Sequence, residues 1–180
     1  MSSDLSTSLR HFAEGGFVIV TDDAKRENEG DLFLLAEHAT TEKLAFMIRY
    51  TSGVICVPMT EARSRELHLP LMVKNNQDTK RTAFTVTVDV KHGITTGISA
   101  EERANTIRAL ADSSMNAEDF IRPGHIFPLV SNEGGLRARQ GHTEAIIEMC
   151  RRVGAKEVGV ISELVNEDGS MMREIGRAHV

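Results

Sequence analysis

The sequence predicts an α/β protein of the α+β kind, a single-domain three-layer α-β-α sandwich with a mixed sheet. Its 180 residues are a usual length for one domain, which we expect to span residues 1–180. Apolar runs of strand length alternate irregularly with amphipathic runs of helix length. This order is typical of a mixed sheet covered by helices on both faces.

The first half of the chain is predicted to contain three helices and three strands. Residues 5–14 favour a short helix that ends at two glycines, and two continuous apolar runs follow, as in strands that are buried. Thr40 is the expected N-cap of the second helix. The predicted elements are a helix at 5–14, strands at 16–21 and 32–36, a helix at 40–50, a strand at 53–58, a short charged helix at 60–67 and an irregular stretch at 69–78.

The second half begins with a run in which apolar and polar residues alternate with a period of two. Thr85 and Asp89 are therefore expected on the outer face of a strand whose other face meets the core. Ser99 and Glu102 then form a capping-box pattern that starts a helix. The remaining run predicts, in order, a strand at 84–90, a glycine-rich loop at 91–98, a helix from 99, an irregular stretch at 113–129, a helix at 144–153, a strand at 158–165 and a turn at 166–169.

Composition excludes several functional classes. The net charge of -5 and the lack of a Lys/Arg run argue against nucleic-acid binding. No apolar stretch approaches the roughly 20 residues of a membrane span, and the N-terminus lacks the apolar core of a signal peptide. Cys56 and Cys150 do not form a CxxC pair, so we expect buried thiols in a reducing, cytoplasmic setting.

An acidic hairpin tip is the first candidate site. Glu27, Glu29 and Asp31 alternate beside Arg26, between two apolar runs. Crowded carboxylates repel one another, and Mg²⁺ typically binds one or two of them together with waters and substrate oxygens. The alternative is a solvated tip whose charges face water. The spacing of an EF-hand loop is excluded, because a leucine stands where that loop needs its glycine.

The segment from Arg139 to Thr143 is the second candidate. It leads directly into a helix, and a helix N-terminus presents free N–H groups and partial positive charge. Gly141 allows close approach of a ligand, while Arg139 and Thr143 add donors, which suits a phosphate. The alternative is that Thr143 only caps the helix and Arg139 is solvated. His142 can bind a divalent metal as a neutral imidazole and so complete a site begun by Glu27, provided that the fold brings them together.

His125 and Glu163 are the remaining candidates for proton transfer. His125 follows a Pro-Gly pair and is expected on a constrained loop, where the alternative is an imidazole bonded to backbone. Glu163 lies in an apolar strand, where it must be paired or have a raised pKa unless strand alternation turns it to solvent. Cys56 is a weaker candidate nucleophile, because no neighbour in sequence would lower its pKa.

Together these segments resemble the 3,4-dihydroxy-2-butanone 4-phosphate synthase family of riboflavin biosynthesis. The similarity runs from about Phe12 to Gly169 and includes several motifs in the family's order. The matching stretches are Asp22-Asp23 with 26–31, Thr82-Ala83-Phe84-Thr85-Val86, 93–99, Arg122-Pro123-Gly124-His125 with 126–129, and 139–145.

The resemblance implies a Mg²⁺-dependent homodimer, with active sites at the subunit interface, that converts D-ribulose 5-phosphate to formate and L-3,4-dihydroxy-2-butanone 4-phosphate. Two Mg²⁺ ions per site are expected, with Mn²⁺ as an alternative. The implied metal ligands are Glu27 and His142, with Glu29 and Asp31 around them, and the implied catalytic pair is His125 and Glu163. Implied substrate contacts are Arg26, Glu27, Asp31, Arg139, Gln140, Gly141, His142, Thr143 and Glu163.

Two departures from the family pattern concern the C-terminal side. Family members usually continue with a further helical segment where residues 171–180 end this sequence, so the packing of that tail is an open expectation. The family's frequent GTP cyclohydrolase domain is also missing from the sequence, which predicts a monofunctional protein. Two rival functions remain: a non-catalytic module with a structural cation, and another Mg²⁺-dependent sugar-phosphate isomerase or lyase.

Overall fold

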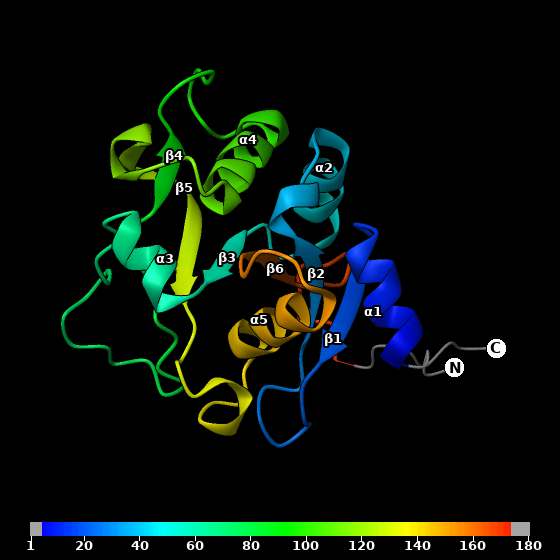
Figure 1. Ribbon diagram of the computed structural model, residues 1–180. Coiled ribbons are helices and arrows are strands. Elements are labelled where there is room, and N and C mark those ends of the chain that lie inside the picture. The colour runs from blue at the N-terminus through cyan, green and yellow to red at the C-terminus, as the bar shows by residue number, and fades with distance from the viewer. Residues whose placement is uncertain (1–4, 174–180) are drawn as a thin grey trace.

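The computed structural model describes residues 5–173 and contains a six-stranded mixed sheet (Figure 1). Its strands are β1 (Val18–Thr21), β2 (Gly30–Leu35), β3 (Cys56–Met59), β4 (Val88–Val90), β5 (Phe120–Val130) and β6 (Gly159–Glu163). They lie in the order β1-β2-β6-β3-β5-β4. The β3–β5 pair is parallel, and the other neighbouring pairs are antiparallel. The predicted mixed sheet is therefore confirmed.

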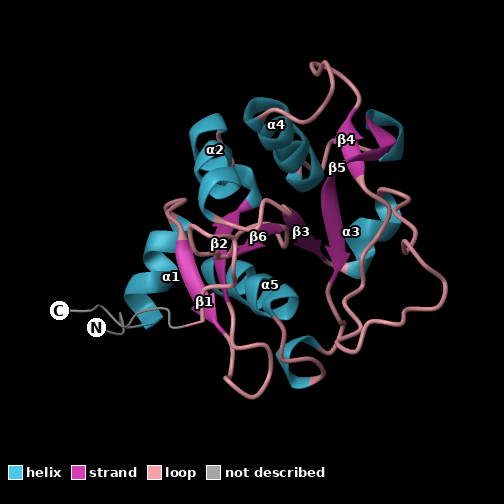
Figure 2. Cartoon of the chain, turned by 180° about the vertical axis from the view of Figure 1, so that it is seen from behind, coloured by secondary structure: helices cyan, strands magenta, loops and turns pink. Residues whose placement is uncertain are grey.

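Helices cover both faces of this sheet, as Figures 1 and 2 show from opposite sides. One face carries α2 (Thr41–Tyr50) and α4 (Ala100–Ala111), which pack against each other, and the opposite face carries α1 (Leu5–Ala13) and α5 (His142–Val153). The shorter elements are α3 (Glu61–Glu66), η1 (Ala36–His38), η2 (Ala117–Asp119) and η3 (Gly135–Arg137). Among residues 5–173, no helix is long and apolar enough to cross a membrane.

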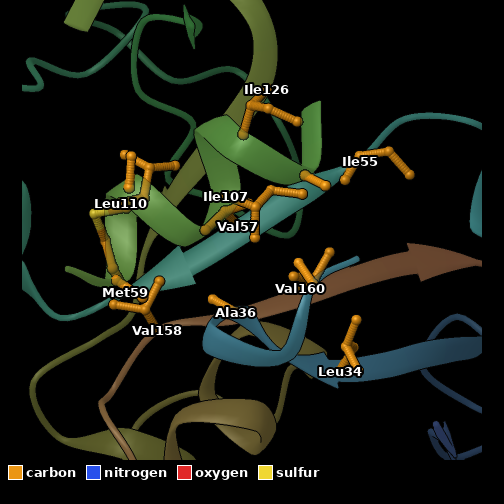
Figure 3. Close-up of a cluster of buried hydrophobic side chains, with 14 of the residues drawn as sticks. Leu34, Ala36, Ile55, Val57, Met59, Ile107, Leu110, Ile126, Val158 and Val160 are labelled. Atoms are coloured by element: carbon orange, nitrogen blue, oxygen red, sulfur yellow. The ribbon is translucent and has the colours of Figure 1, made fainter. Parts of the chain in front are cut away.

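The core consists of two buried clusters, one on each face of the sheet. Strand β2 contributes to both, because Leu34 faces the cluster under α4 while Phe33 faces the cluster under α5. Figure 3 shows Leu34 near Val160, with Ile107 and Leu110 of α4 over the same layer. A strand covered on both faces has no outward positions for polar residues, which explains its continuous apolar run.

Several predicted boundaries are confirmed by their capping interactions. The Thr40 side chain accepts from the amide of Lys43, and Ser99 and Glu102 form the expected reciprocal capping box. Helix α5 begins at His142 rather than Glu144 and ends at Val153, and its C-cap is Gly154, whose φ of 68° is left-handed. Residues 174–180 of the tail singled out in the sequence lie outside the described residues.

The predicted half-exposed strand at 84–90 is wrong in two respects. Regular pairing is confined to Val88–Val90, and residues 84 and 85 form isolated bridges to two different segments. Thr85 and Asp89, expected on an outer face, are 0% and 2% exposed. Their polar atoms are satisfied inside the protein, since Thr85 Oγ1 donates to Pro128 O and Asp89 accepts from His125. The alternation predicted that these two side chains contact solvent, but in the structure they form hydrogen bonds with other protein groups instead.

The prediction of an irregular stretch at 113–129 is also wrong, because β5 runs through residues 120–130. The Pro-Gly-His run is accommodated as a bulge within the strand: Asp89 pairs with Ile121 and Val88 with Ile126, so residues 122–125 leave the ladder. A Cβ on Gly124 would overlap the backbone of Val88 and Asp89. His125 therefore lies on a bulged strand instead of a loop between elements.

Candidate active site

A cavity of about 250 Å³ lies where the β1–β2 hairpin, the end of β6 and the start of α5 meet. We call it the hairpin pocket. It brings together the acidic tip and the helix start, which are more than 100 residues apart in the sequence. The predicted site residues in its lining are Arg26, Glu27, Asp31, Arg139, His142, Thr143 and Glu163, and Glu29 and Cys56 are there too.

Strand register places two of the acids side by side. Asp31 of β2 is the cross-strand partner of Glu163 of β6, and directly paired residues share one face of a sheet. Glu163 is half-buried, and its carboxylate accepts a hydrogen bond from Ser52 Oγ at 2.7 Å. Strand alternation therefore does not turn Glu163 to solvent, as the alternative expected.

Asp22 organises the hairpin tip. Its carboxylate accepts from the amides of Glu27 and Glu29, at 3.0 and 2.9 Å, and from Arg26 Nη1 at 2.8 Å. Burial alone would raise the pKa of Asp22, but these hydrogen bonds outweigh it and hold the pKa below its ordinary value. The sequence marks Asp22 only as part of a motif, since its role depends on amides five and seven residues away.

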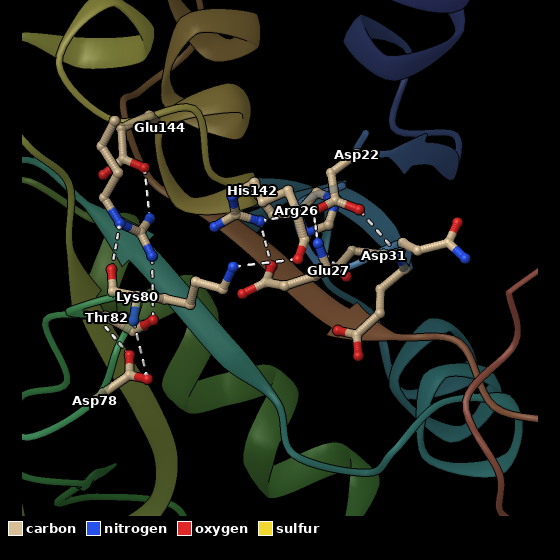
Figure 4. A network of polar contacts seen from close by, with 12 residues as sticks. Asp22, Arg26, Glu27, Asp31, Asp78, Lys80, Thr82, His142 and Glu144 are labelled. Carbon is tan, nitrogen blue, oxygen red and sulfur yellow. Dashed lines mark hydrogen bonds and ion pairs between the residues drawn. The ribbon is translucent and has the colours of Figure 1, made fainter. Parts of the chain in front are cut away.

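The floor of the pocket holds groups that repel one another. Burial, followed by the negative charges of Glu163, Glu29 and other nearby carboxylates, raises the pKa of Asp31 to about 8. Burial likewise lowers the pKa of His142, so its imidazole is neutral at physiological pH. His142 Nδ1 lies 3.3 Å from Asp31 Oδ1. Figure 4 shows His142 and Asp31 beside Arg26.

The donor set fits a divalent cation. Two buried polar atoms, His142 Nε2 and Asp31 Oδ1, have no hydrogen-bond partner among the described residues. A bound cation would stabilise the carboxylates, which repel one another, and would give the neutral imidazole nitrogen the partner that it lacks. No cluster of three acidic, His or Cys side chains with metal-binding geometry occurs within residues 5–173. Carboxylate oxygens, water and substrate oxygens are the ligands that Mg²⁺ prefers.

Arg26 forms an ion pair with Glu27 as well as with Asp22 (Figure 4). Glu27 is thus engaged by a guanidinium from its own loop. To ligate an ion it would have to exchange this partner, and Asp22 would still hold Arg26 in place. The arrangement can therefore neutralise the acidic tip with either the guanidinium or a bound cation.

The opposite side of the pocket is basic and well anchored. Arg139 donates to Glu144 at 2.6 Å, to Thr82 Oγ1 at 3.1 Å and to Lys80 O at 3.2 Å. Three of its five N–H groups are used by these contacts, which leaves one on each terminal nitrogen. Thr143 is 4% exposed, and the N-cap of α5 is Gly141. Both alternatives for this segment, a Thr143 cap and a solvated Arg139, are therefore wrong.

Three predicted residues lie elsewhere. Gln140 is exposed, and Gly141 stands at the start of α5, where a Cβ would collide with Arg139. His125 is paired with Asp89 at 2.7 Å, and the described lining of the hairpin pocket does not contain it.

Burial strongly raises the pKa of the Cys56 thiol, which agrees with its weak candidacy as a nucleophile.

Sequence reasoning missed the loop at 78–82. Lys80 and Thr82 line the pocket, and Lys80 Nζ donates to the carbonyl of Arg26 at 3.2 Å. Asp78 orders this loop by accepting from the amides of Lys80 and Thr82. An Asp followed by Lys and Thr at these spacings indicates a local turn, and the contact with Arg139 depends on the tertiary fold.

Comparisons with known proteins identify the family of this chain. The sequence model described as 3,4-dihydroxy-2-butanone 4-phosphate synthase matches residues 6–177. The enzyme of that name from Saccharomyces cerevisiae is 49% identical over an alignment of 181 residues, gaps included, that covers 96% of this chain and 87% of the relative. The riboflavin biosynthesis protein RibBA of Chlamydia trachomatis is 47% identical over 172 residues, but the chain spans only 41% of its length.

Comparison with solved structures points to the same family as the sequence comparisons. A crystal structure of 3,4-dihydroxy-2-butanone 4-phosphate synthase in complex with two magnesium ions superposes with a TM-score of 0.90 at 48% identity. The match covers 98% of this chain and 81% of that one. The chain therefore belongs to the 3,4-dihydroxy-2-butanone 4-phosphate synthase family of riboflavin biosynthesis.

Proposed function

We propose that this protein converts D-ribulose 5-phosphate to L-3,4-dihydroxy-2-butanone 4-phosphate and formate, by enolisation, dehydration and skeletal rearrangement. The observation that carries the proposal is the composition of the hairpin pocket. A buried, unpartnered His142 Nε2 among carboxylates lies in the same cavity as Arg139 and Lys80. One side suits a cation and the other an anion, as a phosphorylated sugar bound to Mg²⁺ requires.

Glu27 and His142 are the residues that would hold the metal. A structural relative is described with two magnesium ions, and we propose two per site here, with Mn²⁺ as an alternative. When bound, Mg²⁺ would supply Lewis-acid polarisation of the substrate carbonyl. Glu29 and Asp31 lie close enough to this region to accept hydrogen bonds from waters or sugar hydroxyls.

Arg26, Asp31 and Glu163 would orient the sugar. Arg26 can donate to hydroxyl oxygens while Asp22 anchors its guanidinium. Asp31, with a pKa of about 8, can hold a proton at neutral pH, while Glu163 is fixed by Ser52 and is the pocket's candidate for proton transfer. Its proposed partner in proton transfer is His125.

Phosphate binding would use the start of α5. Arg139 has two N–H groups left for a phosphate, and the Thr143 hydroxyl and the backbone around Gln140 and Gly141 add donors at a helix N-terminus. Lys80, whose backbone carbonyl accepts from Arg139 Nε, adds a positive charge to the same pocket.

The location of His125 supports a homodimer with the active site at the interface. His125 is not among the described residues that line the hairpin pocket, and in the proposed dimer a second copy brings it to the substrate. We further propose that the protein acts in the cytoplasm and that its partner is the small sugar phosphate, without a nucleic acid or membrane.

The direct test is a formate assay on purified protein with D-ribulose 5-phosphate, with Mg²⁺ or with EDTA. Formate that appears only with the metal supports the proposal. A structural-cation module would instead gain thermal stability from Mg²⁺ without producing formate. Carbon NMR of the products separates the remaining rival, since another isomerase or lyase would give a phosphorylated product without one-carbon release.

A further inference from the structure

A buried carboxylate contacts His125 at two positions, the backbone amide and the ring. Asp89 of β4 is 2% exposed; its Oδ1 accepts from the backbone amide of His125 at 2.9 Å, and its Oδ2 lies 2.7 Å from the ring Nδ1. The first contact fixes the bulged backbone and the second fixes the ring. The imidazole itself is 39% exposed, so its far edge is accessible.

The surrounding chain is shaped to allow this pair. Gly97, with a φ of 89°, packs against the Asp89 carboxylate, and a Cβ there would overlap that carboxylate and lie 2.9 Å from His125 Nδ1. The bulge at 122–125 brings His125 toward β4. The Gly124 amide donates to Thr87 Oγ1 at 3.1 Å, so the bulge is held at a second position beside Asp89.

Arg103 of α4 contributes a positive charge to the surroundings of Asp89, without an ion pair within 4.0 Å among the described residues. It is 7% exposed, and its guanidinium interacts electrostatically with Asp89. A buried carboxylate needs a positive partner, and an arginine provides one at every physiological pH. The imidazole therefore does not have to be protonated to compensate Asp89. A neutral ring that donates from Nδ1 to Asp89 has a free lone pair on Nε2.

We infer that Asp89 is a positioning residue that holds His125 as the Nδ1–H tautomer and presents Nε2 outward as a proton acceptor. The inference rests on the proposed function, in which His125 takes part in proton transfer. A second residue that fixes the tautomer of a catalytic histidine is a recurrent device, because the wrong tautomer presents an N–H where a lone pair is required.

The first measurement needs no variant. Ring ¹⁵N NMR of the wild-type protein, with His125 identified from the signals missing in His125→Gln, reports which nitrogen carries the proton at the pH of the assay. A protonated Nδ1 with an unprotonated Nε2 supports the inference. An Nε2–H tautomer, or an imidazolium, overturns it whatever the catalytic results.

The second measurement is the turnover of Asp89→Asn with Mg²⁺ and D-ribulose 5-phosphate. The Asn amide can donate to Nδ1, which would move the ring proton to Nε2, as happens in a serine protease when the Asp of its catalytic triad is replaced by Asn. We expect kcat to fall by about 10²–10⁴-fold with little change in KM, together with a change in the His125 ring signals. Asp112→Asn, which alters an exposed turn cap to Ser114, is the matched control and should leave kcat unchanged.

Wild-type kcat in a folded Asp89→Asn would overturn the inference. If this variant does not fold, the His125 tautomer measured in the wild-type protein is by itself the test of the inference. Full turnover in His125→Gln would instead refute the proposed role of His125, while the ring spectrum would still test whether Asp89 sets its tautomer. The two failures are thus distinguishable.

Discussion

The ion pair between Arg139 and Glu144 predicts that removal of the arginine costs stability, and that a second change restores it. The two side chains meet at 2.6 Å, and the side chain of Glu144 is 1% exposed. In Arg139→Ala this carboxylate would remain buried with the Asn132 amide, at 3.0 Å, as its remaining polar partner. Breaking a buried pair by removing one partner costs about 3–5 kcal/mol.

Neutralising the orphaned acid should recover much of this loss. In Arg139→Ala/Glu144→Gln the side-chain oxygen can still accept from Asn132, and no uncompensated charge remains. We expect a coupling energy of about 0.5–3 kcal/mol, so that the double variant loses less stability than the sum of the losses of the two single variants. Since 1 kcal/mol shifts Tm by about 2–4 °C in a protein of this size, Arg139→Ala should melt roughly 10 °C below wild type.

Urea denaturation of the wild type, both single variants and the double variant measures the coupling as a double-mutant cycle. Additive losses would refute the reasoning, because they would mean that Glu144 does not depend on Arg139. The same proteins test the phosphate role: Arg139→Ala and the double variant should both raise KM, since both lack the two free N–H groups. Recovery of KM in the double variant would contradict that role.

Three further predictions concern the metal, its ligands and pH. Glu27→Gln and His142→Ala should each abolish formate release while far-UV circular dichroism remains unchanged; wild-type-like turnover in either would contradict the metal assignment. Mg²⁺ should raise the Tm of the wild type but not of His142→Ala, because the free energy of binding adds to folding only when the ligand set is intact. Hydrogen bonds from the Thr95 amide and hydroxyl and from Ser99 lower the pKa of Glu102 to about 2, from about 4.3 in an unfolded chain. Its contribution is therefore complete above about pH 5 and lost as pH falls toward about 2. The Tm of Glu102→Gln should accordingly lie below that of wild type at neutral pH and converge on it by about pH 2, and a constant gap would be evidence against this linkage.

Local sequence rules succeeded where an element's environment is simple. The apolar run of β2 and the Ser99–Glu102 capping box each depend on contacts within a few residues or on burial of both faces, and both were predictable. Much of the pocket was also predictable, because its acids and its helix start carry recognisable chemistry.

The failures lie where long-range hydrogen bonds override a local signal. The Pro-Gly pair before His125 indicates a turn, but Thr87 and Asp89 bond the displaced amides and keep the segment within β5. Lys80 and Thr82 entered the site through contacts with Arg26 and Arg139, which lie 54 and 57 residues away. No local pattern reports such partners.

The central claim is that an acid from the hairpin and an imidazole from α5 hold one ion. The most direct test is anomalous diffraction from crystals grown with Mn²⁺ and D-ribulose 5-phosphate. The account predicts a peak within coordination distance, roughly 2.0–2.2 Å, of both His142 Nε2 and a Glu27 oxygen. A peak elsewhere, with both side chains free of metal in every subunit, would contradict it.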